Sequence, residues 1–177
     1  MEIGNNIKKI NFWFLTLSII IILCICINNP VGASTKVRPL DFNLVDQYGK
    51  IHNLSSYKGK TVFLNFWATW CPPCGVEICD IDKIYRQYGN NKNNVIILGV
   101  AAPDIENEIS KQGITDFLNK NGYDFPVLFD IGGNVMDEYN IGAFPTTFLI
   151  NKEGDLSRII EGSINKDEMN YLINNIK

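Results

Sequence analysis

The fold depends on residues 61–74, which have the sequence TVFLNFWATWCPPC. Residues 61–68 form a continuous apolar run with β-branched and aromatic side chains, and such a run predicts a strand buried on both faces. Cys71 and Cys74 follow this run directly. From Pro73 to about Tyr88, apolar side chains recur at helical spacing. The sequence therefore places two thiols, separated by two residues, where a buried strand passes into a helix.

Outward from this stretch, predicted strands and helices alternate along the chain. Residues 41–54 predict two short strands around a turn, and apolar runs predict further strands at 95–101, 125–130, 144–150 and 156–162. Helical periodicity predicts helices at 105–121, 134–140 and 166–176. This alternation predicts an α/β fold in which helices cover both faces of a central sheet.

The cysteine pair points to thiol–disulfide chemistry. Cys71 is expected at the helix N-terminus, where the partial positive charge stabilises a thiolate, the attacking species in disulfide exchange. Cys74, one turn further, would resolve the mixed disulfide, and Pro72 and Pro73 suit helix positions whose N–H groups have no partner. A zinc site would need a second ligand pair, and haem attachment would need a histidine where Gly75 stands. A purely structural disulfide remains the alternative.

Composition narrows the function further. The chain has 177 residues, which favours one domain with a short appendage, and its net charge of −3 gives no support for nucleic-acid binding. Three of the five cysteines lie within nine positions, which indicates local redox chemistry rather than a disulfide framework. We expect no metal site. The third of these, Cys79, is expected to be a small core residue, and the single histidine, His52, is expected on the solvated surface.

The N-terminal segment predicts export. Residues 12–27 carry no charge and follow Lys8 and Lys9, which should stay on the cytoplasmic side. A small-residue cleavage site ends at Ala33, so residues 1–33 are either a cleaved signal peptide or an uncleaved signal anchor. Residues 34–177 would form one domain outside the cytoplasm in both cases, either held at the cell membrane by a single span or secreted.

Four segments resemble the thioredoxin superfamily, and in particular its TlpA/ResA-type membrane-tethered reductases. They are DFNLVDQYGKIHNLSSYKGK, TVFLNFWATWCPPC, DFPVLFD and FPTTFLINKEG, and the resemblance covers about residues 38–177. It implies a thioredoxin-like fold with a central mixed β-sheet, an N-terminal β-hairpin and one inserted helix.

The resemblance also implies site residues beyond the two cysteines. Pro145 matches a cis proline that faces the disulfide, and the backbone of Phe144 could pair with an extended substrate. Glu77, three residues after Cys74, matches a carboxylate that exchanges protons with the buried thiol; the alternative is a solvated helix residue. Asn65 stands where ordinary thioredoxins carry a buried aspartate. The expected walls of the active site are Trp70, Pro72, Pro73 and Phe144.

The implied activity is that of a thiol–disulfide oxidoreductase without a cofactor. Reduction of exported protein disulfides is expected, for example in apocytochrome c or a methionine sulfoxide reductase, with electrons from a membrane thiol carrier of the CcdA/DsbD type. The alternatives are a disulfide-forming oxidase or isomerase, a thiol peroxidase and a non-catalytic peptide-binding module. The sequence leaves open the substrate, the direction of electron flow, the fate of the N-terminal segment and the oligomeric state.

Overall fold

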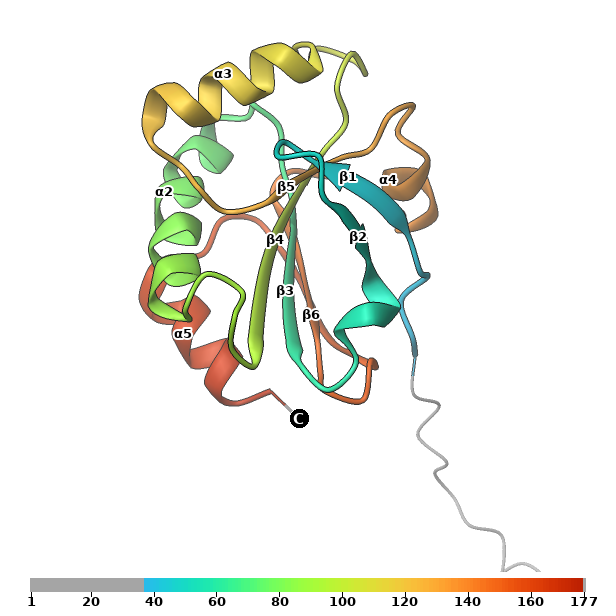
Figure 1. The fold of residues 1–177 in the computed structure, drawn as a ribbon, viewed down its shortest axis with the longest axis vertical. Helices are drawn as coiled ribbons and strands as arrows, with labels where there is room; N and C mark the ends of the chain where they lie inside the picture. The colour runs from blue at the N-terminus through green and yellow to red at the C-terminus, as the bar shows by residue number, and fades with distance from the viewer. Residues whose placement is uncertain (1–36, 177) are drawn as a thin grey trace, which may run out of the picture. The chain divides into compact units, whose positions relative to one another are not determined.

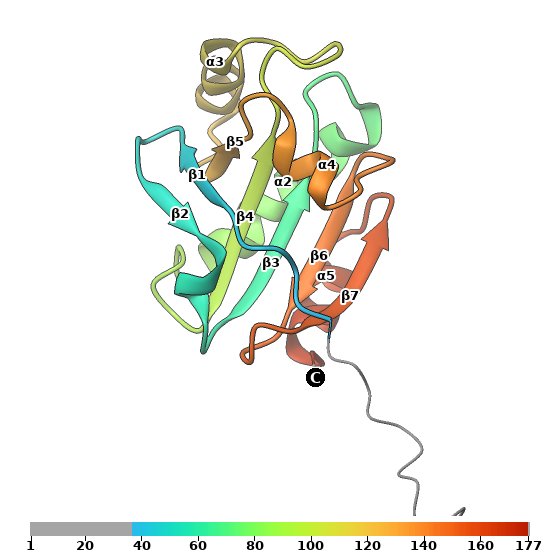
Figure 2. The same cartoon turned by 90° about the vertical axis from the view of Figure 1, so that its right-hand side faces the viewer.

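A computed structural model describes residues 37–176, and the central β3 (Thr61–Phe66) is buried along its whole length. β3 pairs with β4 (Val95–Ala101) in parallel and with β6 (Thr146–Ile150) antiparallel, so the sheet is mixed. The remaining strands are β1 (Asn43–Asp46), β2 (Ile51–Asn53), β5 (Val127–Phe129) and β7 (Leu156–Glu161). The strand order β2-β1-β5-β4-β3-β6-β7 is visible from one edge to the other in Figure 2.

Helices cover both faces of this sheet (Figure 1). Residues from α2 (Pro72–Gln87), α3 (Lys111–Asn121) and α5 (Lys166–Asn174) pack in one core, which also holds Phe63 of β3. The opposite core contains Leu64 and Phe66 of β3 and is covered by α4 (Asn134–Glu138) and the short 3-10 helix η1 (Leu54–Tyr57). Because successive strand residues point to opposite faces, each core receives alternate side chains of β3. The expected thioredoxin-like α/β architecture is confirmed.

The predicted helix at 105–121 begins six residues later than expected. α3 starts at Lys111, and the side chain of Ser110 caps it by accepting a hydrogen bond from the N–H of Gly113 at 3.2 Å. Asp104 and Glu106 adopt positive φ values of 61° and 52°, which a right-handed helix does not allow. Residues 105–110 therefore form a loop, and Ile109, counted in the helical stripe, is 41% exposed.

The prediction for His52 is wrong, because its side chain is only 2% exposed. The antiparallel pairing of β1 with β2 turns the ring inward. There, Nε2 lies 2.8 Å from Oδ2 of Asp46, and Nδ1 contacts the hydroxyl of Tyr57. A buried imidazole needs such polar partners, and these come from residues 6 and 5 positions away.

The expected signal segment, with Lys8, Lys9, Cys24, Cys26 and the cleavage site at Ala33, lies outside the described residues. From residue 37 to residue 176, no helix is both long enough and apolar enough to cross a bilayer.

Candidate functional site

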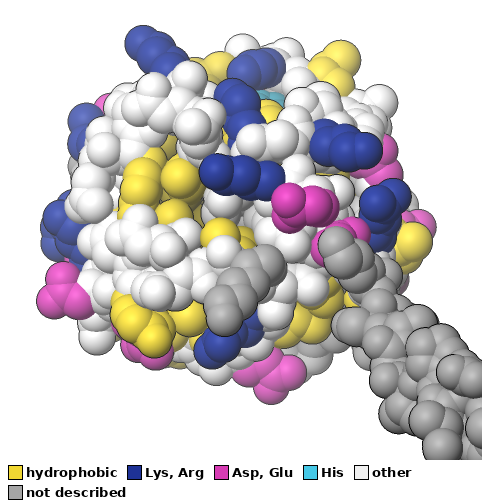
Figure 3. Space-filling model, turned by 90° about the horizontal axis from the view of Figure 1, so that it is seen from below, with side chains coloured by type: hydrophobic (Ala, Val, Ile, Leu, Met, Phe, Trp, Pro, Cys, Tyr) yellow, Lys and Arg dark blue, Asp and Glu magenta, His cyan; other side chains and the backbone are white. Residues whose placement is uncertain are grey.

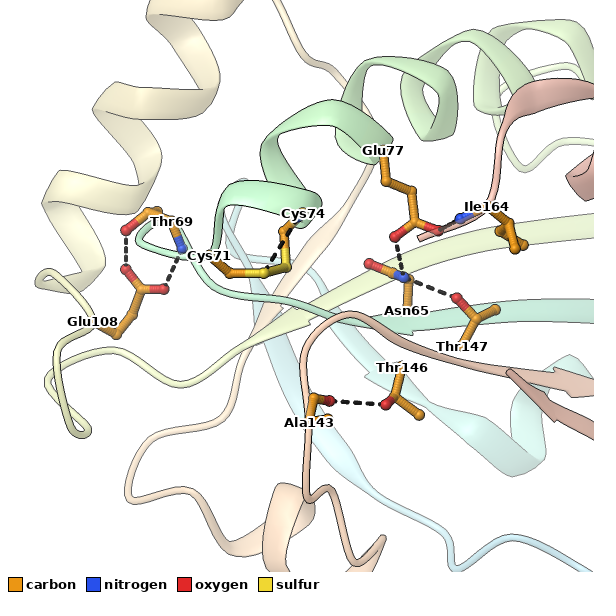
Figure 4. Close-up of a disulfide and its surroundings, with 10 residues drawn as sticks. All are labelled: Asn65, Thr69, Cys71, Cys74, Glu77, Glu108, Ala143, Thr146, Thr147 and Ile164. Atoms are coloured by element: carbon orange, nitrogen blue, oxygen red, sulfur yellow. Dashed lines mark hydrogen bonds between the residues drawn. A yellow bond between two sulfur atoms is a disulfide. The ribbon is translucent and has the colours of Figure 1, made fainter. Parts of the chain in front are cut away.

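Cys71 and Cys74 form a disulfide at the N-terminus of α2, with a Cα–Cα distance of 5.3 Å (Figure 4). Cys71 is the N-cap residue, and its sulfur accepts a hydrogen bond from the N–H of Cys74 at 3.3 Å. Pro72 and Pro73 fill the first two helical positions, and both are exposed. The cysteines themselves are 4% and 1% exposed, so the disulfide is covered except where a partner can approach Cys71.

The strand–helix junction explains this placement. β3 ends at Phe66, and Trp67 continues into the core with an exposure of 2%. The chain then turns through Thr69 and Trp70, and the N–H of Cys71 donates to the carbonyl of Ala68 at 3.3 Å. The sulfur of Cys71 therefore lies at the positive end of the α2 dipole, which stabilises negative charge there.

The loop before β6 provides the second part of the site. The Phe144–Pro145 peptide bond is cis, as the resemblance implied. The hydroxyl of Thr146 donates to the carbonyl of Ala143 at 2.8 Å, and Figure 4 shows this pair in the loop next to the disulfide. The ring of Phe144 packs edge-on against Trp70 at a centroid distance of 5.9 Å, so the structure brings these two predicted wall residues together. Pairing with β3 starts only at Thr146, which leaves the Phe144 backbone beyond the sheet ladder.

Glu77 is a buried carboxylate and not a solvated helix residue, since it is 2% exposed. Its Oε1 accepts from the N–H of Ile164 at 3.1 Å, and its Oε2 accepts from Nδ2 of Asn65 at 3.1 Å (Figure 4). Burial raises its pKa to about 7, and these two hydrogen bonds oppose the rise in part. A carboxyl group one helical turn beyond Cys74 that titrates near neutrality can accept or return a proton.

Asn65 connects the sheet to Glu77. It is fully buried in the middle of β3, opposite Thr147 of β6. Its Nδ2 donates to Glu77 and, at 2.9 Å, to the hydroxyl oxygen of Thr147, whereas its Oδ1 has no hydrogen-bond partner. In Figure 4 this oxygen is the end of the amide turned toward the disulfide. Sequence reasoning noted only that Asn65 cannot titrate, and did not foresee these contacts.

A groove of about 390 Å³ opens beside the disulfide. Its lining includes Trp70, Cys71 and Phe144. Sequence reasoning missed Glu108, which lies in this lining and is 9% exposed. Its carboxylate accepts from the N–H of Thr69 at 2.7 Å and from the Thr69 hydroxyl, and so fixes the turn before Cys71 (Figure 4). No motif indicated this role, because 39 residues separate the two partners.

Cys79 lies outside this site. The prediction of a core residue is wrong, because Cys79 is half-buried. It is the free cysteine of the described part of the chain. The side chain of Lys83 lies near it, one turn further along α2. Across residues 37–176, no three His, Cys, Asp or Glu side chains are grouped as metal ligands would be.

Comparison with known proteins places this geometry in a family context. A model of the Redoxin family matches residues 32–173. The chain is 37% identical over 137 residues to the thiol-disulfide oxidoreductase ResA of Geobacillus kaustophilus, covering 77% of this chain and 75% of that protein. It is 35% identical over 137 residues to ResA of Bacillus subtilis, covering 77% and 73% of the two chains.

Solved structures agree with these sequence relatives. The pneumococcal exposed lipoprotein thioredoxin (Etrx1) of Streptococcus pneumoniae is 33% identical with a TM-score of 0.68, and the match covers 77% of this chain and all of that one (100%). StoA of Bacillus subtilis is 28% identical with a TM-score of 0.66, and the match covers 75% and 96% of the two chains.

Proposed function

Since the chain belongs to the Redoxin family and, within the thioredoxin superfamily, to the TlpA/ResA-type thiol–disulfide oxidoreductases, we propose that it reduces protein disulfides on the outer side of a bacterial membrane. The observation that carries this proposal is the pairing of the Cys71–Cys74 disulfide with a buried carboxyl group, Glu77, whose pKa is about 7.

The chemistry follows from the positions of the three side chains. In the reduced protein, the Cys71 thiolate attacks one sulfur of the substrate disulfide, forms a mixed disulfide and releases the other substrate sulfur as a thiolate. Cys74 then gives up its proton and attacks Cys71, which releases the second substrate sulfur and closes the Cys71–Cys74 disulfide. Glu77 in its ionised form can take the proton of Cys74. The substrate gains two electrons, and the protein loses them.

The residues between the cysteines favour electron donation. Proline has no N–H, so Pro72 and Pro73 cannot donate to the Cys71 sulfur, and the N–H at 3.3 Å is that of Cys74. A thiolate with fewer donors is less stabilised, and a less stabilised reduced form is a better reductant. An ionised Glu77 acts in the same direction, because a nearby negative charge disfavours a second one on sulfur.

The geometry at the other end of the domain suits a membrane tether. The carbonyl of Val37 accepts from the N–H of Leu156 at 2.7 Å, and Leu156 pairs with Ile150, the end of β6 farthest from Pro145. Val37, the first described residue, therefore lies at the end of the sheet opposite the disulfide. Figure 3 shows both basic and acidic side chains around this end, and the cavity there is lined by Arg38, Lys58 and Lys60 together with Asp41 and Glu153. The position of Val37, and not the charge of this end, therefore supports the proposed tether.

The proposed partners follow from the location and the direction of electron flow. An outward reductase needs electrons from across the membrane, for which we propose a thiol carrier of the CcdA/DsbD type. Apocytochrome c or an exported methionine sulfoxide reductase would be substrates, since both present disulfides outside the cytoplasm.

The reduction potential of the Cys71–Cys74 pair tests the direction of electron flow. We expect a value close to the roughly −270 mV of thioredoxin, measured by equilibration of the full chain with dithiothreitol redox buffers. A value close to the roughly −120 mV of strongly oxidising relatives would reject the reductase and favour a disulfide-forming oxidase.

A further inference from the structure

The groove beside the disulfide is lined by acidic residues and by no basic ones. Three carboxylate residues line it, Glu106, Glu108 and Asp137, and its lining contains no Lys, Arg or His. Glu108 is committed to Thr69 and to the N–H of Ile109 at 2.8 Å. Glu106 and Asp137 are exposed, and within residues 37–176 neither has an ion-pair partner. The negative charge of these two side chains is therefore available to an incoming molecule.

The same groove is also apolar where it approaches Cys71. Trp70 is 43% exposed, and Phe144, which packs against it, and Ile141 are half-buried in the same lining. Exposed aromatic side chains of this kind bind large apolar side chains of a partner. The carboxylates come from two different segments, Glu106 from the loop after β4 and Asp137 from α4, so the negative potential covers the groove rather than one point.

We propose that this groove selects protein disulfides whose flanking residues are basic and apolar, and disfavours those flanked by acidic residues. This inference rests on the proposed exchange reaction and specifies its substrate class. A lysine or arginine beside the substrate cysteine would lie near Glu106 and Asp137 while its apolar neighbour contacts Trp70 and Phe144. Charges at the rim of an interface act mainly on the association rate and are screened by salt.

Two peptides that differ only in charge test the proposal. Each carries one intramolecular disulfide, flanked by lysines in the first and by glutamates in the second, and each is mixed with the reduced full chain. Oxidation of the chain is followed by tryptophan fluorescence. We expect the lysine peptide to react roughly ten-fold faster at low salt, because an exposed ion pair supplies up to about five-fold and two are present. The ratio should fall toward one in about 1 M salt.

Matched variants locate the effect. Glu106→Gln and Asp137→Asn should each lower the rate ratio of the two peptides by about two- to five-fold. Glu138→Gln serves as the control, because this exposed residue is adjacent on α4 but does not line the groove. Equal rates for both peptides, or a ratio that only Glu138→Gln lowers, would overturn the proposal. A wild-type chain that reacts with neither peptide and not with oxidised glutathione would instead refute the proposed function, and this inference with it.

An independent observation concerns the unpaired Oδ1 of Asn65. Asn65 points to the same face of β3 as Phe63 and Trp67, which share a core with Cys74. Cys74 and Glu77 are three residues apart on α2 and so lie on one side of the helix. Asn65 thus faces both, with its Nδ2 on Glu77 and its Oδ1 turned toward the disulfide (Figure 4). A buried oxygen without a donor is costly, and in this state the neighbouring sulfur carries no proton.

We infer that Asn65 is a positioning residue for the exchange reaction, whose Oδ1 accepts the S–H of Cys74 in the reduced protein. Reduction of the disulfide by two electrons and two protons creates this S–H, and the unpaired oxygen then gains its donor. The same amide holds the Glu77 carboxylate through Nδ2. When Cys74 attacks Cys71, its proton passes to Glu77, and Oδ1 loses its partner again.

Infrared spectroscopy of the S–H stretching band tests this inference. In the full chain with Cys71→Ser, the band of Cys74 is isolated by subtracting the spectrum of the Cys71→Ser/Cys74→Ser variant. We expect it at the low-frequency, hydrogen-bonded end of the S–H range. Adding Asn65→Leu should shift it to the high-frequency end, whereas Thr147→Val, which removes a partner of Nδ2 only, should not move it. A band already at the high-frequency end in the Cys71→Ser chain, where Asn65 is intact, would overturn the inference, whether or not the Asn65 variant folds.

Discussion

Two buried polar networks in this domain differ in how completely they are satisfied. Around His52, Oδ1 of Asp46 accepts from the N–H groups of Tyr48 and Lys50 at 2.9 Å each, while Oδ2 faces the imidazole, whose other nitrogen meets Tyr57. Behind the disulfide, Asn65 leaves Oδ1 unpaired, and the pKa of Glu77 is far above that of an ordinary carboxyl.

This difference distinguishes buried polar groups that hold a local conformation from those that take part in proton transfer. Polar atoms with full sets of partners fix a local conformation, here the β1–β2 hairpin against η1. A network that leaves an acceptor open and keeps a carboxyl group near its titration point can take up a proton when a thiol forms next to it. We expect substitutions in the first network to change stability with little effect on exchange, and those in the second to change exchange or its pH dependence.

The largest expected effect is the loss of stability on breaking the network around His52, whose polar atoms all have partners. His52→Ala leaves the buried Asp46 carboxylate without its side-chain partner and should lower the free energy of unfolding by about 3–5 kcal/mol. Urea unfolding of the oxidised chain measures this loss, and Tyr57→Phe, which removes one hydroxyl, should cost about 1–2 kcal/mol. A loss below about 1 kcal/mol for His52→Ala would mean that the network contributes little to the hairpin.

The network of Asn65 and Glu77 behind the disulfide should make the stability of the domain depend on pH. The pKa of Glu77 is about 7 in the folded protein against 4.5 in an ordinary carboxyl, so protonated Glu77 is favoured by folding. The stabilising contribution of Glu77 to the free energy of unfolding is fully present below pH 4.5 and is lost as the pH rises through 7. Wild type should therefore lose roughly 2–4 kcal/mol relative to Glu77→Gln over this range. Unfolding of both at pH 4.5 and pH 8 measures the difference, and parallel profiles would contradict it.

The same substitution should slow disulfide exchange. Glu77→Gln keeps the shape of the side chain but cannot take the proton of Cys74, and loss of general acid–base catalysis costs about 100-fold or more. Stopped-flow measurement should show the deficit in closure of the Cys71–Cys74 disulfide and not in the first attack by Cys71. His52→Ala, assayed where it is folded, is the control. Equal slowing of both steps by Glu77→Gln would point to a general distortion instead.

The backbone of the site could be predicted from the sequence better than its polar contacts could. The apolar run of β3 and the periodicity after Pro73 placed Cys71 and Cys74 correctly, because burial of local apolar faces dominates strand and helix formation. The cis Phe144–Pro145 bond and the position of Glu77 came from the resemblance. The burial of His52, the amide orientation of Asn65 and the contact of Glu108 with Thr69 depend on residues brought together by tertiary packing, for which local periodicity carries no signal.

The smallest expected effect is the loss of stability when the Thr147 hydroxyl is removed, compared with removal of the Tyr57 hydroxyl from the network around His52. Thr147→Val keeps the side-chain shape and removes the oxygen that accepts from Nδ2 of Asn65 at 2.9 Å, while the bond from Asn65 to Glu77 remains. It should cost about 1 kcal/mol in urea unfolding, less than Tyr57→Phe, because Nδ2 of Asn65 keeps its bond to Glu77 whereas Nδ1 of His52 loses its hydrogen-bond partner. Exchange should slow less than in Glu77→Gln. If Thr147→Val instead destabilised the domain more than Tyr57→Phe, the network behind the disulfide would be as structurally committed as the one around His52.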